Sequence, residues 1–433
     1  MVLSDRIRNH SGRVSVIGQG YVGLPLAMEF AKVGFDVVGI DLDEDKVVAL
    51  NRGESYIPDV ESQVLRGLLA KKRYRATNNM DVLADSDAII ICVPTPLRKT
   101  KDPDISFVYS SAAEVKARLR EGQLIILEST TYPGTTKELL LPMFEERGLK
   151  VGKDFFLAFS PERIDPGNQQ FQVRDIPKVV GGVTPACSRV AALLYEQVVI
   201  RVTEVSSPTV AELAKLYENT FRSVNIAMAN EFAMMCRYLD VNVWEVIEAA
   251  ATKPFGFMPF FPGPGIGGHC IPIDPIYLSW KLRLSGYEAR FIALADEVNR
   301  SMPRYVIELL MDALNTREKC LKGARVLILG VAYKRGVSDM RESPALNVIT
   351  ELQRKGAVVH YADPFVASLE HEGLSTPCVA ATAETIRAAD AVVIVTDHKE
   401  FDYRMIVHTA DLVIDARNAT RGIDAPEGRL IRL

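Results

Sequence analysis

A glycine-rich turn comes directly after the first apolar strand that this sequence predicts. Gly18, Gly20 and Gly23 have the spacing GxGxxG, between a strand expected at Val14–Gly18 and a helix expected from about Leu24 to Val33. In such a turn the first glycine allows the sharp bend, the second lets a pyrophosphate approach the backbone, and the third lets helix and strand pack closely. The helix N-terminus adds N–H donors and partial positive charge. The motif predicts an α/β fold with a dinucleotide site; the alternative is a glycine-rich turn in an unrelated α/β fold.

An acidic residue completes this pattern. Asp41 ends the second expected strand, Val37–Asp41, 18 residues after Gly23. A carboxylate at this place accepts hydrogen bonds from ribose hydroxyls and repels a 2′-phosphate, so it favours NAD over NADP. We therefore expect NAD as the cofactor, bound by Asp41 and by the turn that also contains Tyr21 and Val22.

Strands and helices alternate in both the first half and the last third of the chain, which predicts parallel sheets with helices on both faces. Further strands are expected in the first half at Ala88–Val93, Leu124–Leu127 and Phe155–Phe159. The pattern starts again after Lys322-Gly323, with expected strands at Arg325–Gly330, Val358–Tyr361, Ala391–Thr396 and Leu412–Asp415 and a helix at Ser343–Lys355.

A long helix separates these two regions. No glycine or proline interrupts the chain between Ser207-Pro208 and about Tyr238, and 31 residues of helix span roughly 46 Å. Helices at about Val243–Ala251 and Ala289–Asn299 are expected to complete a helical middle domain. The fold class is thus α/β, with two Rossmann-like, doubly wound domains at 1–203 and 303–433 and a helical, dimerising domain at 204–302.

Charge and cysteine content exclude several kinds of partner. The net charge is −4 from 51 basic and 55 acidic side chains, which gives no overall field to hold nucleic acid or an anionic membrane. The six cysteines are scattered without a CxxC pair, which argues against a disulfide scaffold and against a metal site. With no apolar signal segment or membrane span in the sequence, we expect a cytoplasmic protein.

The segment before Cys270 is the most unusual one. Four glycines and a proline lie between Gly263 and Gly268, which indicates a loop that approaches a ligand closely or adopts positive φ. A cysteine after such a loop can lie near a helix N-terminus that stabilises its thiolate, with His269 and Asp274 close by in the sequence. Cys270 is therefore a candidate nucleophile; the alternative is a small buried thiol.

Polar residues also gather on the long helix. Lys215, Asn219 and Arg222 are four and three residues apart, so they share one face. This row either faces a cleft, where a lysine can be tuned to carry a proton, or forms a solvated stripe.

Several turns are expected at the carboxyl edges of the sheets, where parallel sheets bind ligands. In the first domain these are the turns with Thr95, with Glu128-Ser129-Thr130 and with Ser160-Pro161-Glu162-Arg163. In the last domain Lys334 follows a strand without a GxGxxG motif, so it either holds a phosphate or is an exposed surface lysine.

These segments occur together in one recognisable order: GQGYVGLPLA, CVPTPL, ESTTYPGTT, SPERIDPGN, AKLYENTFRSVN, FPGPGIGGHCIPIDP and GVAYKRGVSDMRESPA. Over essentially its whole length the chain resembles the UDP-glucose/GDP-mannose dehydrogenase family. The resemblance implies oxidation of C6 of a nucleotide sugar from alcohol to carboxylate, with two NAD.

The resemblance also implies roles for single residues. Cys270 matches the catalytic cysteine, Lys215 and Asn219 the catalytic pair on the helix, Asp274 the aspartate that handles water and protons, and Glu162 the acid near the reacting carbon. The matching cofactor contacts are Thr95, Thr130 and Arg341, and the candidate substrate contacts are Arg163, Arg222, Phe260, Gly267 and Lys334.

The cysteine motif departs from that of UDP-glucose dehydrogenases. Ile273 stands where they have a lysine, and His269 where they typically have a serine. The segment resembles instead the subgroup that acts on N-acetylated sugars. Loss of a lysine and gain of apolar surface beside the sugar would suit a neutral 2-acetamido group. The expected substrate is UDP-N-acetylglucosamine, with UDP-N-acetylgalactosamine, UDP-N-acetylmannosamine and UDP-glucose as alternatives.

Two other classes of function are alternatives to this one. A two-electron hydroxyacid-type dehydrogenase would not need Cys270, and a non-catalytic regulator that binds NAD or a nucleotide sugar would not need Lys215, Asn219 and Asp274. The apolar circumference of the long helix predicts a homodimer or a higher homo-oligomer, in which Lys253 is a candidate to reach a neighbouring subunit's sugar site.

Overall fold

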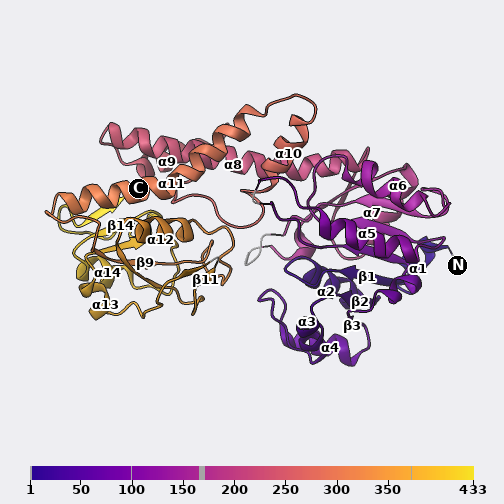
Figure 1. Cartoon of the computed structure of the whole chain (residues 1–433). Coiled ribbons are helices and arrows are strands. Elements are labelled where there is room, and N and C mark those ends of the chain that lie inside the picture. The colour runs from indigo at the N-terminus through magenta and orange to yellow at the C-terminus, as the bar shows by residue number, and fades with distance from the viewer. Residues whose placement is uncertain (1, 99, 165–170, 372) are drawn as a thin grey trace. The chain divides into compact units, whose positions relative to one another are not determined.

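The computed structural model describes residues 2–98, 100–164, 171–371 and 373–433. Their contacts divide the chain into two compact units. The first unit comprises the chain up to Glu218 together with Ile276–Gly286, and the second comprises Asn219–Pro275 and Tyr287–Leu433. Each unit is described by itself below (Figure 1).

An eight-stranded sheet organises the first unit, in the order β3-β2-β1-β4-β5-β6-β7-β8. The strands are β1 (Arg13–Ile17), β2 (Asp36–Ile40), β3 (Tyr74–Thr77), β4 (Ala88–Ile91), β5 (Leu124–Leu127), β6 (Phe156–Phe159), β7 (Lys178–Gly182) and β8 (Val202–Val205). All neighbouring pairs are parallel except β6 and β7, which are antiparallel. The first six strands have the order of dinucleotide-binding folds, as the sequence predicts.

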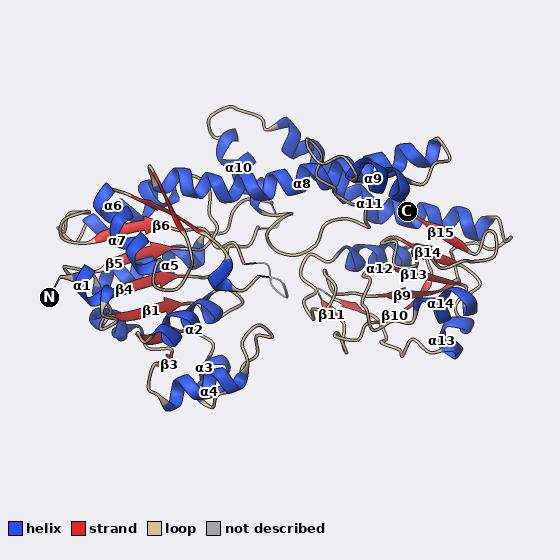
Figure 2. Cartoon of the chain, turned by 180° about the vertical axis from the view of Figure 1, so that it is seen from behind, coloured by secondary structure: helices blue, strands red, loops and turns tan. Residues whose placement is uncertain are grey.

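Helices cover both faces of this sheet (Figure 2). They are α1 (Leu3–Arg8), α2 (Gly23–Val33), α3 (Glu44–Asn51), α4 (Ser62–Ala70), α5 (Ser106–Arg118), α6 (Leu141–Glu145) and α7 (Pro185–Tyr195). Ile90 belongs to the core under α2 and α7, whereas Ile89 and Ile91 belong to the core under α5 and α6. Successive side chains of a strand point to opposite faces, so an uninterrupted apolar strand such as β4 is buried on both.

The helical middle of the chain contributes to both units. Helix α8 (Pro208–Tyr238) has the 31 residues that the sequence predicts, and α9 (Val243–Ala251) follows it. Helix α10 (Asp274–Arg283) was not expected from the sequence. Helix α11 (Arg290–Asn315) is much longer than the expected Ala289–Asn299 and continues through Pro303. Its second half buries an apolar face against the core of the C-terminal sheet, which outweighs the cost of the proline.

A five-stranded parallel sheet organises the second unit, in the order β10-β9-β13-β14-β15. The strands are β9 (Arg325–Leu329), β10 (Val358–Ala362), β13 (Ala391–Ile394), β14 (Val413–Asp415) and β15 (Leu430–Arg432). Helices α12 (Pro344–Arg354), α13 (Ala383–Ala388) and α14 (Tyr403–Thr409) accompany it, and β11 (Glu370–His371) and β12 (Leu374–Ser375) form a small separate pair. A second parallel α/β domain is therefore present, as predicted.

Candidate active site

The glycine turn of the first unit has the geometry that a pyrophosphate requires. A Cβ atom on Gly18, whose φ is +93°, would lie 2.4 Å from the carbonyl oxygen of Cys92, and one on Gly23 would lie 1.9 Å from that of Gly18. A Cβ on Gly20 would meet nothing within 4 Å. Packing within the protein thus requires two of the glycines, whereas Gly20 borders open space at the start of α2, so these residues fit a dinucleotide.

Asp41 and Gln19 fix the shape of this turn. The Gln19 N–H donates to Oδ2 of Asp41 at 2.9 Å, and the Asp43 N–H donates to Oδ1 at 3.1 Å. The Gln19 side chain is fully buried, donates to the Val16 carbonyl and accepts from the Tyr74 hydroxyl. The Asp41 side chain stays 14% exposed, so it is still accessible to a ribose. Sequence reasoning missed Gln19 because it occupies a variable position of the motif.

The predicted sheet-edge turns follow three adjacent strands, β4, β5 and β6, so the fold brings them to one edge. Thr95 and Thr130 are half-buried. The Thr95 carbonyl accepts a hydrogen bond of 2.9 Å from the Tyr277 hydroxyl of α10, which fixes the turn after β4. The turn after β5 is fixed by the Ser129 hydroxyl, which donates to the Val93 carbonyl at 2.8 Å.

Glu162 is part of a buried charged cluster with Lys178 and Glu128. The Lys178 Nζ lies 2.7 Å from Oε2 of Glu162 and 2.9 Å from Oε1 of Glu128. Oε1 of Glu162 also accepts the N–H groups of Arg163 and Ile164. Burial disfavours ionisation of Glu162, but attraction to Lys178 and these hydrogen bonds outweigh it and lower its pKa. Lys178 has no sequence motif around it, and sequence reasoning missed it.

Arg163 lies in the same turn and is held by protein groups. Its guanidinium forms an ion pair with Glu218 on α8 and donates to the Pro177 carbonyl at 2.9 Å. Lys215 lies nearly one helical turn before Glu218 and is 9% exposed. Lys215 is therefore in the buried part of the helix, which argues against the solvated stripe at this position.

Glu212 connects the start of α8 to the turn after Thr130. Its buried carboxylate accepts the N–H of Gly134 at 2.6 Å and both the N–H and the hydroxyl of Thr136, at 3.0 and 2.7 Å. Burial raises the pKa of Glu212, and these hydrogen bonds oppose that rise. Sequence reasoning missed Glu212, which lies three residues before Lys215.

The second unit contains Cys270 in a tight turn. Its carbonyl accepts the N–H groups of Ile273 at 3.1 Å and of Asp274 at 2.8 Å, where α10 begins. Oδ2 of the buried Asp274 accepts a hydrogen bond of 2.5 Å from the Asn219 amide. Three predicted catalytic residues, Cys270, Asp274 and Asn219, are thus connected in one place.

Cys270 also differs from the remaining thiols in exposure. It is half-buried, whereas Cys92, Cys187 and Cys236 are buried and Cys320 and Cys378 are exposed. Burial raises the pKa of the Cys92 thiol well above its usual value, which makes that thiol a poor nucleophile.

The glycines before Cys270 are explained by packing against protein. Gly265 and Gly268 have φ values of +125° and +81°, and the Gly268 N–H donates to the Arg341 carbonyl at 3.1 Å. A Cβ on Gly267 would lie 2.8 Å from Cβ of Tyr333, and one on Gly268 would lie 2.9 Å from the Tyr333 ring. The sequence predicts either positive φ or close approach of a ligand for these glycines. Gly265 and Gly268 have positive φ, and the group that lies close to Gly267 and Gly268 is the turn after β9.

The other predicted contacts of the second unit lie on α8, before the cysteine loop and after β9. Arg222 is exposed, and the Phe260 ring packs edge-on against Phe221, with ring centroids 5.6 Å apart. Lys334 is half-buried in the turn after β9. The Arg341 guanidinium forms an ion pair with Asp339 at 2.6 Å.

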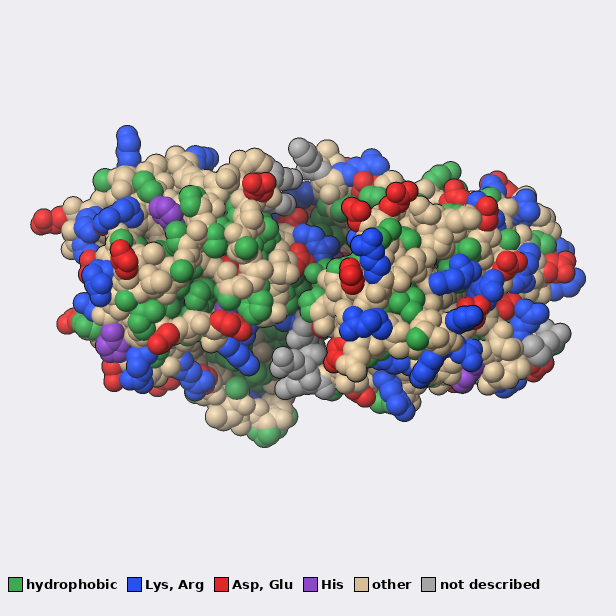
Figure 3. All heavy atoms as spheres, turned by 90° about the horizontal axis from the view of Figure 1, so that it is seen from below, with side chains coloured by type: hydrophobic (Ala, Val, Ile, Leu, Met, Phe, Trp, Pro, Cys, Tyr) green, Lys and Arg blue, Asp and Glu red, His purple; other side chains and the backbone are tan. Residues whose placement is uncertain are grey.

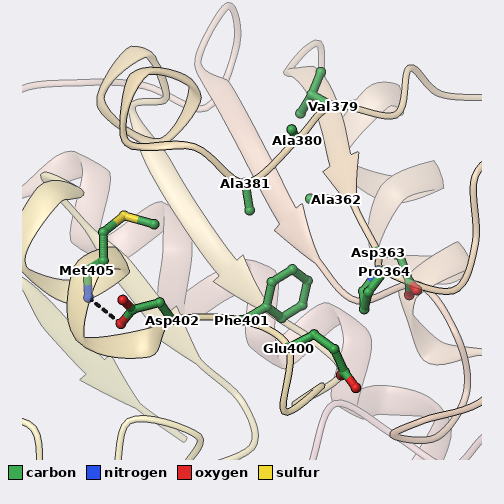
Figure 4. A pocket seen from close by; sticks show the side chains of 10 residues that line it. All are labelled: Ala362, Asp363, Pro364, Val379, Ala380, Ala381, Glu400, Phe401, Asp402 and Met405. Atoms are coloured by element: carbon green, nitrogen blue, oxygen red, sulfur yellow. Dashed lines mark hydrogen bonds between the residues drawn. The ribbon is translucent and has the colours of Figure 1, made fainter.

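A cavity of about 340 Å³ opens at the carboxyl edge of the second sheet (Figure 4). It is lined by Ala362, Asp363, Pro364, Val379, Ala380, Ala381, Glu400, Phe401, Asp402 and Met405. Asp402 accepts the Met405 N–H at the start of α14. These ten described residues include no lysine or arginine, so the cavity does not suit a diphosphate.

Charges of both signs are interspersed on the face drawn in Figure 3. Within the described ranges, no three histidine, cysteine or acidic residues gather in a way that could hold a metal ion. None of the described helices combines the length and apolarity that crossing a membrane requires.

Comparison with known proteins identifies three successive domains of one family in this chain. Three sequence models of one family match the chain: the NAD binding domain of the UDP-glucose/GDP-mannose dehydrogenase family at residues 12–199, its central domain at 209–301 and its UDP binding domain at 327–422. A UDP-N-acetyl-D-mannosamine dehydrogenase of Pyrococcus horikoshii is 36% identical over 97% of this chain and 98% of its own. A UDP-N-acetyl-D-glucosamine 6-dehydrogenase of Pseudomonas aeruginosa is 36% identical over 90% of this chain and 91% of its own.

Solved structures of UDP-N-acetyl-mannosamine dehydrogenases are similar to this chain over nearly its whole length. The structure of the UDP-D-ManNAc dehydrogenase of Pyrococcus horikoshii has a TM-score of 0.89 at 34% identity, covering 97% of this chain and 98% of its own. The UDP-N-acetyl-mannosamine dehydrogenase Cap5O of Staphylococcus aureus has a TM-score of 0.82 at 31% identity, with the same coverage. With its dinucleotide turn and all three domain matches, the chain belongs to the UDP-glucose/GDP-mannose dehydrogenase family of NAD-binding oxidoreductases.

Proposed function

We propose that this protein oxidises C6 of a UDP-N-acetylhexosamine from alcohol to carboxylate, with two NAD per sugar. The turn that holds Cys270 carries this proposal. In this turn the backbone carbonyl of the half-buried Cys270 accepts the N–H of Asp274, and the buried Asp274 carboxylate accepts a hydrogen bond from Asn219. A two-electron dehydrogenase or a binding protein has no use for such an arrangement.

UDP-N-acetylglucosamine is the first candidate substrate, supported by the resemblance of the cysteine segment and by the Pseudomonas aeruginosa relative that matches 90% of the chain. Ile273 stands at the position of a lysine in UDP-glucose dehydrogenases, and the loss of that charge suits a neutral acetamido group. UDP-N-acetylmannosamine is the second candidate, supported by the Pyrococcus horikoshii relative that matches 97% of the chain. Side-by-side turnover of the three N-acetylated UDP-sugars and UDP-glucose decides between them, and a preference for UDP-glucose would contradict the proposal.

The proposed cofactor contacts belong to the first unit except for Arg341, and the proposed substrate contacts come from both units. Gly18, Gly20, Tyr21, Val22, Gly23 and Asp41 hold NAD, with Thr95, Thr130 and Arg341 as further contacts. Bound NAD would supply the hydride acceptor for the oxidation of C6, with a separate NAD molecule for each of the two hydrides. The substrate contacts are Arg163, Arg222, Phe260, Gly267 and Lys334.

Protein groups would carry the protons and the covalent bond. Lys215, directly or through water, takes the proton of the C6 hydroxyl in the first oxidation. The Cys270 Sγ then bonds to C6 of the aldehyde to form a thiohemiacetal, and Lys215 and Asn219 stabilise its oxygen. After the second oxidation a thioester remains. Water positioned by Asp274 and Glu162 attacks C6, the C6–Sγ bond breaks, and the carboxylate leaves.

Replacement of Cys270 tests this function. Cys270→Ser is expected to lower acid formation by on the order of 10³-fold or more, while NAD still binds. Cys320→Ser, which alters an exposed thiol, is the matched control. Acid formation by Cys270→Ser at the rate of this control would contradict the covalent mechanism.

The helical middle would form a homodimer. Tyr217, Met228 and Tyr238 on α8 are 72%, 60% and 94% exposed, which is unusual for large apolar side chains on a long helix. A second copy of the chain would cover them and could bring Lys253 to its partner's sugar site. Sedimentation is expected to give twice the 47.9 kDa mass of the chain; a monomer would contradict the dimer.

A further inference from the structure

The charged cluster around Lys178 has a composition that stability alone does not explain. The side chains of Lys178, Glu128 and Glu162 are 3%, 0% and 10% exposed. Removing three charges from water is costly, and apolar residues of similar volume often replace buried ion pairs at no cost in stability. A cluster of one cation and two carboxylates therefore calls for a further reason.

The cluster connects two turns of the candidate active site. Glu128 directly follows β5 and precedes Ser129-Thr130, while Glu162 belongs to the turn after β6. Lys178 begins β7 and bonds to both carboxylates. One ammonium group thus fixes the turn with a proposed cofactor contact and the turn with a proposed catalytic acid.

The two carboxylates have different surroundings. Glu162 accepts two backbone N–H groups and Lys178, and its pKa is lowered. Glu128 faces Lys178, Glu162, the Tyr195 hydroxyl and the Cys92 thiol, and burial raises its pKa. Glu162 is therefore the carboxylate that stays ionised, and Glu128 is the one that takes up a proton first.

Glu162 keeps capacity for one more hydrogen bond. A carboxylate offers about four acceptor sites. Bonds from described residues fill three of them, two on Oε1 and one on Oε2. Because Lys178 fixes Oε2, the direction of the remaining site on this oxygen is fixed too. The side chain is 10% exposed, which admits a water molecule.

We propose that Lys178 is a positioning residue that orients Glu162 toward the water that hydrolyses the thioester. This rests on the proposed function, in which the thioester forms on Cys270. In hydrolysis the water oxygen bonds to C6, the C6–Sγ bond breaks with its electron pair going to Sγ, and Glu162 accepts the hydrogen bond of the attacking water. Lys178 touches neither the water nor the sugar and acts through Glu162.

A charge-matched double variant tests this. Lys178→Met alone leaves two buried carboxylates facing each other without a cation, which is expected to destabilise the fold. Lys178→Met with Glu128→Gln removes one charge of each sign, so the cluster keeps its net charge, and thermal unfolding checks that the double variant is folded. Lys116→Met, which breaks a surface pair with Glu146, is the control for loss of a lysine.

In rapid-mixing experiments the double variant is expected to release two NADH per subunit in a normal first burst. Its steady-state rate then falls roughly 10- to 100-fold, because thioester hydrolysis has become limiting. Without the cation the pKa of Glu162 rises, so the acid limb of the kcat profile moves to higher pH. Lys178→Arg, which keeps the charge, is expected to restore the position of that limb.

A folded double variant with the kcat and the acid limb of the Lys116→Met control would overturn the role of Lys178. Failure of the proposed function shows separately, in the wild type. One NADH per product there would remove the thioester itself, whatever the variants of Lys178 do.

Discussion

The two α/β domains begin with the same local arrangement and use it differently. In each of these sheets the first strand in the sequence is followed directly by a glycine with positive φ, Gly18 at +93° and Gly330 at +81°. The second strand is followed directly by an aspartate that accepts the N–H of the residue after that glycine. These bonds are 2.9 Å from Gln19 to Asp41 and 2.7 Å from Val331 to Asp363.

The difference lies in what surrounds each aspartate. Asp41 stays partly exposed beside the open space at Gly20. Asp363 has no exposed side-chain surface and accepts four backbone N–H groups and the His398 ring. The shared backbone therefore supports a dinucleotide site only in the first domain. In the second domain the corresponding carboxylate, that of Asp363, holds the turn before Lys334 through these hydrogen bonds.

Replacement of each aspartate by alanine is the test of this comparison with the largest expected effect. Asp363→Ala leaves several buried N–H donors without their acceptor and is expected to lower the free energy of unfolding by about 3–5 kcal/mol. Asp41→Ala is expected to cost about 1 kcal/mol, because water can replace its carboxylate, but it weakens NAD binding and relaxes the preference over NADP. Denaturant titration and cofactor kinetics measure both; equal stability losses would contradict the comparison.

Replacement of the glycines in the first turn is a second test of this comparison. Gly23→Ala places a Cβ 1.9 Å from a backbone oxygen, so the backbone must shift, at an expected cost of about 1–3 kcal/mol. Thermal unfolding is the measurement. An unchanged midpoint would show that close packing of α2 on β1 is not required.

Gly20→Ala is the matched change with the opposite outcome. Its Cβ meets no protein atom within 4 Å, so stability is expected to stay at the wild-type level. A methyl group in the space for the pyrophosphate is expected to weaken NAD binding roughly 10-fold, or about 1.4 kcal/mol. Calorimetric titration with NAD checks this, and wild-type affinity would place the cofactor elsewhere.

Acid stability gives the smallest effect. Burial works against ionisation of Asp363, but hydrogen bonds from His398 and from backbone N–H groups outweigh it and lower its pKa. A lowered pKa adds stability above the unfolded value of about 3.9, and this stability is lost as pH falls through the folded value. Asp363→Asn is therefore expected to flatten the loss of stability below about pH 4. An unchanged slope in acid unfolding curves would contradict this.

Much of the fold could be predicted because its signals are local. The uninterrupted apolar run of β4 and the glycine spacing after β1 each depend on neighbouring residues. The extent of α11 could not be predicted, because burial of residues after Pro303 against a distant sheet decides it. The antiparallel pairing of β7 with β6 has no local signal either.

The candidate site divides in the same way. Cys270 and the Gly18–Gly23 turn stand out in the sequence because their chemistry needs rare local patterns. Lys178, Glu212 and Gln19 do not, since each depends on a partner far away in the sequence, such as Glu162 for Lys178 and Tyr74 for Gln19. Only the folded chain brings those partners together.

The most direct test of the central claim is the number of NADH molecules formed per sugar acid when the wild-type protein has consumed a limiting amount of UDP-N-acetylhexosamine. Two successive oxidations of one carbon, with Cys270 holding it between them, predict a ratio of two. A ratio of one would contradict the account.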